Sequence, residues 1–257
     1  MESQFTCVVV GVTGDGKSTT CNTMVGSDVF DTSGGLGSET SACSHSDYLY
    51  LGPSVREMRI VDTIGLHDTD LPQEEVMRRF SAFADLVPCG IDLFLFIVRW
   101  GRFKPEHEAA FDAFVANCGE AALGNTLLVF TSCGLSAEAL AAQIDSHAPP
   151  SLRRLLPKLV STPIGIDSIK DRSAARATLH AAIDLAAAAT NGLRYSNEAL
   201  AEARSRHDVK QEEERAAFAA AVADWRKGSG PVIVERECAS GSAAAATDAT
   251  GATSRSA

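Results

Sequence analysis

The chain has 257 residues, of which 45% are hydrophobic and 22% charged, and its formal net charge is −10. This length predicts one α/β domain with an appendage, large enough to bury a substantial core. The acidic balance excludes nucleic acid as an expected partner, and seven cysteines without a C-x-x-C pair exclude a zinc site or a disulfide framework.

Residues 11–18 read Gly-Val-Thr-Gly-Asp-Gly-Lys-Ser, which is the G-x-x-x-x-G-K-S spacing of a phosphate-binding P-loop. The preceding run, residues 5–10, is rich in β-branched side chains and predicts a buried strand. After the loop, Cys21, Met24 and Val25 have the spacing of a helix that buries one face. A strand before the loop and a helix after it are the context that a P-loop requires.

The chemistry of this loop follows from its residue types. Its glycines allow backbone N–H groups to turn inward and hold phosphate oxygens, and the next helix directs its positive end at the same anion. Lys17 is expected to reach the β- and γ-phosphates, and the Ser18 hydroxyl is expected to bind Mg²⁺. The predicted nucleotide contacts are Gly11, Val12, Thr13, Gly14, Asp15, Gly16, Lys17, Ser18 and Thr19.

A polar loop rich in Ser, Gly and Thr is predicted over residues 31–43, followed by strands over 48–51 and 58–61. Directly after the second strand, residues 62–65 read Asp-Thr-Ile-Gly, the D-x-x-G pattern of a nucleotide switch. In such a switch the carboxylate holds Mg²⁺ through water, and the glycine N–H meets the γ-phosphate until hydrolysis releases it. Asp62 is therefore a candidate metal ligand and Gly65 a candidate catalytic residue.

The loop between the two motifs is expected to supply a threonine to Mg²⁺ and the γ-phosphate. Thr40 is the candidate for both the metal-binding and the catalytic role, and Thr32 and Ser38 are competing choices.

The remainder of the first 190 residues alternates helix and strand signals, which is typical of a mostly parallel sheet covered on both faces. Apolar residues at helical spacing predict further helices near residues 76–87, 111–115, 152–159 and 179–186. Apolar runs predict further strands over residues 91–98, 126–130 and 160–164.

From residue 197 to 227 the composition changes to Ala, Glu and Arg with mixed charges, which predicts a solvated helix. Its middle is polar nearly all round, so it either projects as a partner-binding arm or packs back along the domain. Residues 228–257 are mostly Ala, Ser, Gly and Thr and predict disorder. The expected division is a nucleotide-binding domain over 4–190, a helical extension over 191–227 and a disordered tail over 228–257.

Membrane attachment is not expected. No segment approaches the roughly 20 apolar residues of a membrane helix, and the N-terminal run has no signal-peptide pattern. Glu2 stands where myristoylation requires glycine, and the ending Ser-Arg-Ser-Ala is no prenylation box. The chain is expected to be cytoplasmic.

Together, the P-loop, the Val-Asp-Thr-Ile-Gly-Leu segment at 61–66 and the run at 96–103 resemble the AIG-type GTPases. These are the GTPases of immunity-associated proteins, relatives of septins and of chloroplast-import receptor GTPases. The resemblance covers about residues 4–190, and its most specific element is Gly-Arg-Phe at 101–103, followed by Pro-Glu-His-Glu at 105–108. It implies a Ras-like P-loop G domain, binding of Mg²⁺ with GTP or GDP, and nucleotide-dependent homodimerisation across the active site.

Slow intrinsic hydrolysis is expected, because Leu66 stands where small GTPases carry the glutamine that positions water. An arginine finger is worth roughly 10³–10⁵ in rate. The resemblance makes Arg102 the candidate, delivered by a second subunit; Arg99 is the second choice, and a surface salt bridge is the alternative role of Arg102. His67 and His107 lie close in sequence to the predicted site residues and are expected to have structural roles.

Base recognition departs from the family's Thr-x-x-Asp pattern, whose aspartate accepts hydrogen bonds from guanine. Thr131, a predicted cofactor contact, is followed by Ser132, Cys133 and Gly134, so glycine stands at the aspartate position. The last base-contacting motif, near 163–167, also lacks its expected asparagine. Unpaired buried donors on the base would cost about 1–3 kcal/mol. Relaxed specificity between GTP and ATP, contacts from a partner and backbone contacts all remain open.

The sequence therefore predicts a slow Mg²⁺-dependent GTPase, a switch or scaffold stimulated by dimerisation. The alternative is a nucleotide-binding interaction module without turnover, in which the helix at 197–227 binds a protein partner. A P-loop ATPase or kinase would account for Gly134 but not for the motifs at 62–65 and 101–103.

Overall fold

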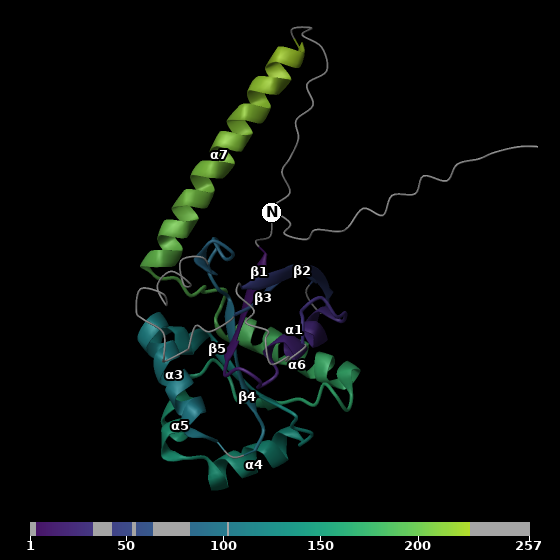
Figure 1. Cartoon of the computed structure of the whole chain (residues 1–257), viewed down its shortest axis with the longest axis vertical. Coiled ribbons are helices and arrows are strands. Elements are labelled where there is room, and N and C mark those ends of the chain that lie inside the picture. Colours follow the sequence, from purple (N-terminus) through teal and green to yellow (C-terminus); the bar gives the residue numbers. More distant parts are fainter. Residues whose placement is uncertain (1–3, 33–42, 53–54, 64–82, 102, 227–257) are drawn as a thin grey trace, which may run out of the picture. The chain divides into compact units, whose positions relative to one another are not determined.

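A computed structural model of the chain describes residues 4–32, 43–52, 55–63, 83–101 and 103–226. Within these ranges, one sheet has the strand order β2-β3-β1-β4-β5-β6. Figure 1 shows this sheet between helices. In chain order its strands are β1 (Phe5–Gly11), β2 (Ser44–Leu51), β3 (Val55–Asp62), β4 (Leu93–Arg99), β5 (Thr126–Thr131) and β6 (Ile164–Gly165).

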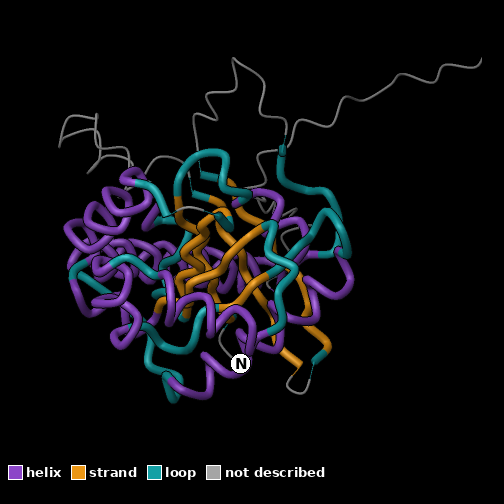
Figure 2. Tube along the Cα trace, turned by 90° about the horizontal axis from the view of Figure 1, so that it is seen from below, coloured by secondary structure: helices purple, strands orange, loops and turns teal. Residues whose placement is uncertain are grey.

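All neighbouring strands of this sheet pair in parallel except β2 and β3, which are antiparallel. The exception follows from the connection, because only residues 52–54 separate these two strands and a parallel crossover needs a dozen or more residues. The predicted mostly parallel sheet with helices on both faces is confirmed, and the tube view of Figure 2 shows strands surrounded by helices.

In the described residues, helices lie between β1 and β2, between β4 and β5 and between β5 and β6, and two more follow β6. In chain order the helices are α1 (Lys17–Val25), α3 (Pro105–Cys118), α4 (Ala137–His147), α5 (Pro150–Leu155), α6 (Arg172–Ala189) and α7 (Glu198–Arg226), with 3₁₀ turns at Glu120–Asn125 and Leu156–Lys158. Among the residues that the structure describes, no helix is both long and apolar enough to cross a membrane.

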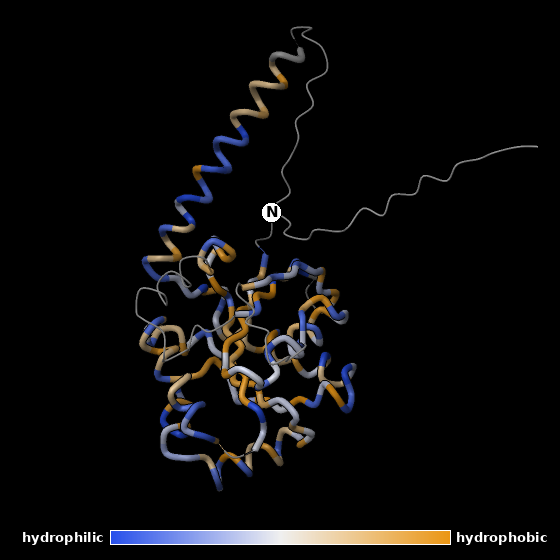
Figure 3. The backbone as a smooth tube through the Cα atoms, in the orientation of Figure 1, coloured by the Kyte–Doolittle hydropathy of each residue, from blue (hydrophilic) through white to orange (hydrophobic). Residues whose placement is uncertain are grey.

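Each central strand contributes to two apolar layers, because successive side chains point to opposite faces of a sheet. Val8 of β1 and Phe96 of β4 are buried in one layer with Phe111 of α3. Val9 and Leu95, their neighbours in sequence, are buried in the other layer with side chains of α1 and α6. Figure 3 shows the strands at the centre of the sheet as predominantly hydrophobic.

Contacts divide the chain into two units, Met1–Val209 and Lys210–Ala257. Helix α7 begins in the first unit, where Leu200 and Ala203 are buried. In the second unit, residues 210–220 of the same helix are all exposed. The helix predicted at 197–227 is therefore confirmed as secondary structure, with burial limited to its first turns.

Several elements differ from the sequence predictions, and β2 and β3 begin at Ser44 and Val55, earlier than the predicted residues 48 and 58. The last strand begins at Ile164 rather than near residue 160, because Pro163 has no N–H to donate to a sheet ladder. Helix α4 is not predicted by the sequence pattern, since only Leu140 and Ile144 are buried along it and two apolar residues make a weak signal. The helix predicted near 76–87 falls mostly outside the described residues.

Gly11 of β1 approaches the backbone of β4 closely. Its φ is 139°, and a Cβ built there would lie 2.3 Å from the carbonyl oxygen of Ile97. Because Gly11 and the Ile97 carbonyl both belong to the backbone of the central sheet, the strands would have to separate to admit a side chain at residue 11.

We therefore expect Gly11→Ala to lower the free energy of unfolding by about 1–3 kcal/mol, as other overpacked cores do. Denaturant unfolding followed by circular dichroism measures this change. Gly124→Ala is the matched control, because its Cβ would meet nothing within 4 Å. Equal stability of the two variants would contradict the close packing described for Gly11.

Candidate functional site

The candidate site lies where the carboxyl ends of three parallel strands meet. Strand β1 lies between β3 and β4, with Val9 opposite Asp62 and Gly11 opposite Ile97. The backbone and side chain of Thr63 both donate to the carbonyl of Val9, at 3.3 and 2.6 Å. This pairing places the end of β3 beside the start of the P-loop.

The turn between β1 and α1 exposes an uncapped helix start. Gly14 and Gly16 have φ of 88° and 97°, in the left-handed region that favours glycine. Gly16 is the N-cap residue of α1 and offers no side-chain hydrogen bond to the first turn, which also contains no acidic residue. The first N–H groups of α1 can therefore serve an external anion.

Lys17 folds back over the loop that precedes it. Its Nζ donates to the carbonyl oxygens of Gly11 and Val12, at 2.9 and 3.2 Å. Burial lowers the pKa of Lys17, while the charges of Asp62 and Asp15 act to raise it. A phosphate group is a stronger partner for this ammonium than two neutral carbonyls, so the side chain is placed to exchange one for the other.

Ser18 and Asp62 form a direct contact between the two predicted motifs. The Ser18 hydroxyl donates to Oδ2 of Asp62 at 2.5 Å. The other carboxylate oxygen, Oδ1, is buried without a hydrogen-bond partner. Burial raises the pKa of Asp62, against the opposing effects of the Ser18 hydrogen bond and the Lys17 charge.

This pair fits a magnesium ion. A hydroxyl beside a carboxylate with an orphaned buried oxygen is a hard-oxygen ligand set, which Mg²⁺ prefers. The described residues contain no group of three or more His, Cys, Asp or Glu that could hold a metal ion. An ion between Ser18 and Asp62 would therefore take few protein ligands, as Mg²⁺ does where a phosphate supplies the rest.

Asp15 connects the P-loop to the neighbouring elements. Its backbone carbonyl accepts from the Thr131 hydroxyl at the end of β5, at 2.6 Å. Its Oδ2 lies 3.2 Å from Nε2 of His107 in α3, without hydrogen-bond alignment. Burial raises the pKa of Asp15, and the nearby His107 acts to lower it.

His107 is held in turn by the start of its own helix. The backbone N–H of Lys104 donates to Nδ1 of His107 at 3.1 Å, which leaves the proton of a neutral ring on Nε2, toward Asp15. The sequence predicts only a structural role for His107, and no local pattern could link it to Asp15, because the contact joins elements distant in the chain.

The predicted site residues fall into two groups. The structure brings together the turn from Gly11 to Thr19, Asp62 and Thr131, which all lie at one edge of the sheet. Thr40, Gly65 and Arg102, to which the sequence assigns catalytic roles, lie outside the described residues. Their roles therefore stay predictions.

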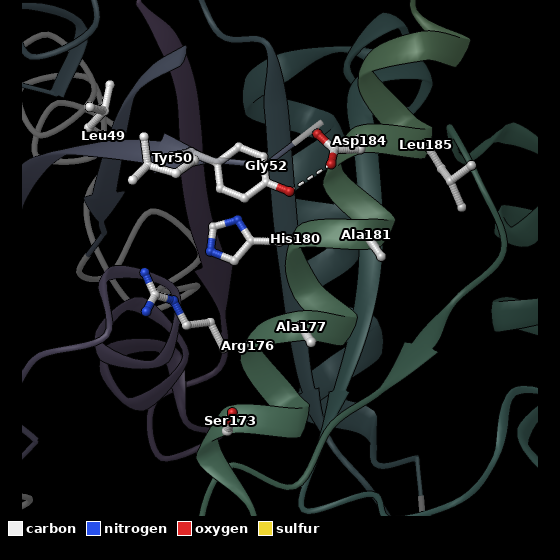
Figure 4. A pocket seen from close by; sticks show the side chains of 11 residues that line it. Leu49, Tyr50, Gly52, Ser173, Arg176, Ala177, His180, Ala181, Asp184 and Leu185 are labelled. Atoms are coloured by element: carbon white, nitrogen blue, oxygen red, sulfur yellow. Dashed lines mark hydrogen bonds between the residues drawn. The ribbon is translucent and has the colours of Figure 1, made fainter. Parts of the chain in front are cut away.

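A separate groove lies between the edge strand β2 and helix α6 (Figure 4). The ring of Tyr50 stacks on His180 with a centroid distance of 4.3 Å, and its hydroxyl donates to Asp184 at 2.8 Å. Arg56 also pairs with Asp184. No P-loop residue lines this groove, so it is not part of the candidate nucleotide site.

Comparison with known proteins agrees with this geometry. A family model described as the AIG1 family matches residues 5–215. The chain is 28% identical over 126 residues to the immune-associated nucleotide-binding protein 10 of Arabidopsis thaliana, a match that spans 48% of this chain but only 27% of that protein.

Two solved structures of Toc33 from Arabidopsis thaliana are similar in fold. A dimerisation-deficient arginine-to-alanine mutant has a TM-score of 0.56 and 18% identity, covering 75% of this chain and 87% of that chain. The complex with Mg²⁺ and GMPPNP has a TM-score of 0.54 and 18% identity, and the match covers 75% of this chain and 86% of that chain.

Asp62→Asn is expected to stabilise the free protein and to weaken the binding of any ligand that requires Mg²⁺. A buried carboxyl with a raised pKa favours folding when it is protonated and loses that contribution as pH rises through its folded-state pKa. At neutral pH the neutral amide should therefore raise the free energy of unfolding, on the order of 1 kcal/mol.

Denaturant unfolding at several pH values measures this effect, and the advantage of Asp62→Asn should shrink as pH falls. Asp47→Asn is the control, and its expected effect on stability has the opposite sign. Partial burial acts to raise the pKa of Asp47, but the Arg59 guanidinium lowers it overall. A loss of stability in Asp62→Asn at neutral pH would show that the Ser18 and Lys17 contacts outweigh the cost of burying the charge.

Proposed function

The chain belongs to the AIG1 family, and from this premise we propose that it binds guanine nucleotides with Mg²⁺ and hydrolyses GTP slowly. In this proposal it acts as a switch or scaffold whose hydrolysis is stimulated when two copies meet across the nucleotide.

The observation that carries the proposal is the contact between Ser18 and Asp62. Two motifs far apart in sequence meet through a 2.5 Å hydrogen bond, and the second oxygen of the carboxylate remains buried without a partner. A hydrogen bond that served only the fold would not need the second carboxylate oxygen to be buried without a partner, since such a group costs stability. A site kept for a cation accounts for it.

Each residue of the site has a separate task in this proposal. Lys17 and the N–H groups at the start of α1 hold the phosphates, and Ser18 and Asp62 hold the metal. Bound Mg²⁺ supplies positive charge against the phosphate oxygens. Thr40 and Gly65 are proposed to contact the γ-phosphate from the two switch segments.

Hydrolysis in this proposal depends on an arginine from a second subunit. Leu66 has no polar group that could orient a water molecule. Arg102 directly precedes Phe103, whose ring lies 5.3 Å from the ring of His107, and His107 contacts Asp15 of the P-loop. Phe103 thus packs near a side chain that contacts the phosphate loop. An arginine-to-alanine mutant of the similarly folded Toc33 is dimerisation-deficient.

Lys17→Ala is expected to weaken binding of Mg²⁺–GTP about thirtyfold or more, the effect of removing one partner of a buried charge pair. Calorimetric titration of the full chain measures it. Lys158→Ala is the matched control, because Lys158 is exposed and pairs with Glu120 away from the P-loop. No binding by the wild-type chain, or equal binding by Lys17→Ala, would contradict the proposed function.

The rate of GTP hydrolysis per subunit is expected to rise with protein concentration across the range in which dimers form. Arg102→Ala should lower this rate about 10³-fold or more while leaving nucleotide affinity unchanged. Arg99→Ala, three residues earlier, tests the second candidate and should retain the rate if Arg102 is the arginine finger.

Phosphate release measured over a dilution series distinguishes the alternatives. Rates that stay flat with concentration, or equal rates in wild type and Arg102→Ala, would overturn the role of a second subunit's arginine. Binding without phosphate release at any concentration would support an interaction module without turnover, the interpretation that Leu66 favours.

A further inference from the structure

The position expected to read the nucleotide base holds no side chain. Gly134 is exposed, and a Cβ built on it would meet nothing within 4 Å. The space beside residue 134 is therefore open, and any acceptor for a base there has to come from a neighbouring segment.

The segment after β6 is that neighbour. Strands β5 and β6 pair in parallel, with Phe130 opposite Gly165. Beyond the paired strands, the N–H of Ile166 donates to the carbonyl of Phe130 at 2.8 Å, and the N–H of Cys133 donates to the carbonyl of Ile166 at 2.8 Å. The approach is close, since a Cβ on Gly165 would lie 2.7 Å from Sγ of Cys133. The turn at 133–134 and the chain at 166–167 are thus fixed side by side.

Asp167 stands at the start of this neighbouring segment and is held by hydrogen bonds from the residues that follow it. Its Oδ1 accepts from the backbone N–H of Lys170 at 3.1 Å, and its carbonyl accepts from the N–H of Asp171 at 3.0 Å. The side chain is only partly buried. A carboxylate has about four acceptor positions, so one hydrogen bond from Lys170 leaves most of them for a ligand.

The carboxylate of Asp167 also lies near the turn that contains Gly134. Burial raises the pKa of the Cys133 thiol, and the negative charge of Asp167 adds to that effect. Cys133 directly precedes Gly134, so the charge acts on the turn at which a base acceptor is expected.

This region is continuous with the phosphate site. Thr131, at the end of β5, donates to the carbonyl of Asp15 in the P-loop, and its side chain lies 3.5 Å from the position of a Cβ on Gly16. A nucleotide whose phosphates occupy the P-loop would therefore have its base end near the turns after β5 and β6.

We propose that Asp167 is the residue that selects guanine in this chain, accepting hydrogen bonds from the base in place of the missing side chain at residue 134. The inference rests on the proposed function. Guanine presents two adjacent donors, its N1–H and its 2-amino group, which one carboxylate can accept together. Adenine lacks that pair of donors, so an acceptor-only carboxylate discriminates against it.

Asp171 is the competing carboxylate nearest in sequence, and it lies farther along the chain from Ile166, the residue that contacts Cys133. It is the N-cap residue of α6, and its Oδ1 accepts from the N–H of Ala174 at 2.9 Å. Asparagine is an equally good N-cap residue, so Asp171→Asn keeps this contact and serves as a matched control.

The test exchanges the chemistry of the acceptor rather than removing it. In Asp167→Asn the amide keeps one acceptor for the base N1–H and gains a donor, which suits the 2-oxo group of xanthine instead of the 2-amino group of guanine. Dissociation constants of the full chain for GTP, ATP and XTP, each with Mg²⁺, are measured for the wild type, Asp167→Asn and Asp171→Asn.

The wild type and Asp171→Asn are expected to bind GTP at least tenfold more tightly than ATP or XTP. Asp167→Asn is expected to lose about tenfold to a hundredfold in GTP affinity and to prefer XTP. Because the gain of XTP binding requires a folded protein, misfolding cannot imitate it.

Unchanged preference for GTP in Asp167→Asn would overturn the role of Asp167 and leave the proposed function standing. Equal binding of GTP and ATP by the wild type would do the same, because no base selection would remain to be assigned. Binding of none of the three nucleotides by the wild type would instead overturn the proposed function itself, and this inference with it.

Discussion

The central position of β1 is the constraint on which the rest of the structure depends. Because β1 pairs in parallel with both β3 and β4, the ends of these three strands meet at one edge of the sheet. This arrangement requires the approach of Gly11 to the backbone of Ile97, and it brings Asp62 to the start of the P-loop. The order of strands, rather than any single side chain, creates the site.

The groups gathered there are costly to the free protein. A lysine and two carboxyls have their pKa values shifted by burial, and two of their oxygens lack hydrogen-bond partners. Unsatisfied buried groups are rare in native structures, and perturbed pKa values cluster at functional sites. In the proposed function, a magnesium nucleotide supplies an anion for Lys17 and a cation for Asp62. Structure and proposed function therefore explain one another.

Local patterns in the sequence are sufficient to predict the fold and the phosphate-binding turn, because each depends on residues close together in the chain. The antiparallel direction of β2 and the late start of β6 depend on a short connection and on Pro163, which apolar patterns do not capture. The contact of His107 with Asp15 and the place of Asp167 beside the turn at 134 join distant segments, and only the folded chain reveals them.

The most direct test of the account is a crystal structure of the full chain with Mg²⁺ and a non-hydrolysable GTP analogue. The account predicts that Lys17 leaves the carbonyls of Gly11 and Val12 for phosphate oxygens, and that the metal separates Ser18 from Asp62. It also predicts the carboxylate of Asp167 within hydrogen-bond distance of the guanine base. A nucleotide bound elsewhere, with Lys17 and the pair of Ser18 and Asp62 unchanged, would contradict it.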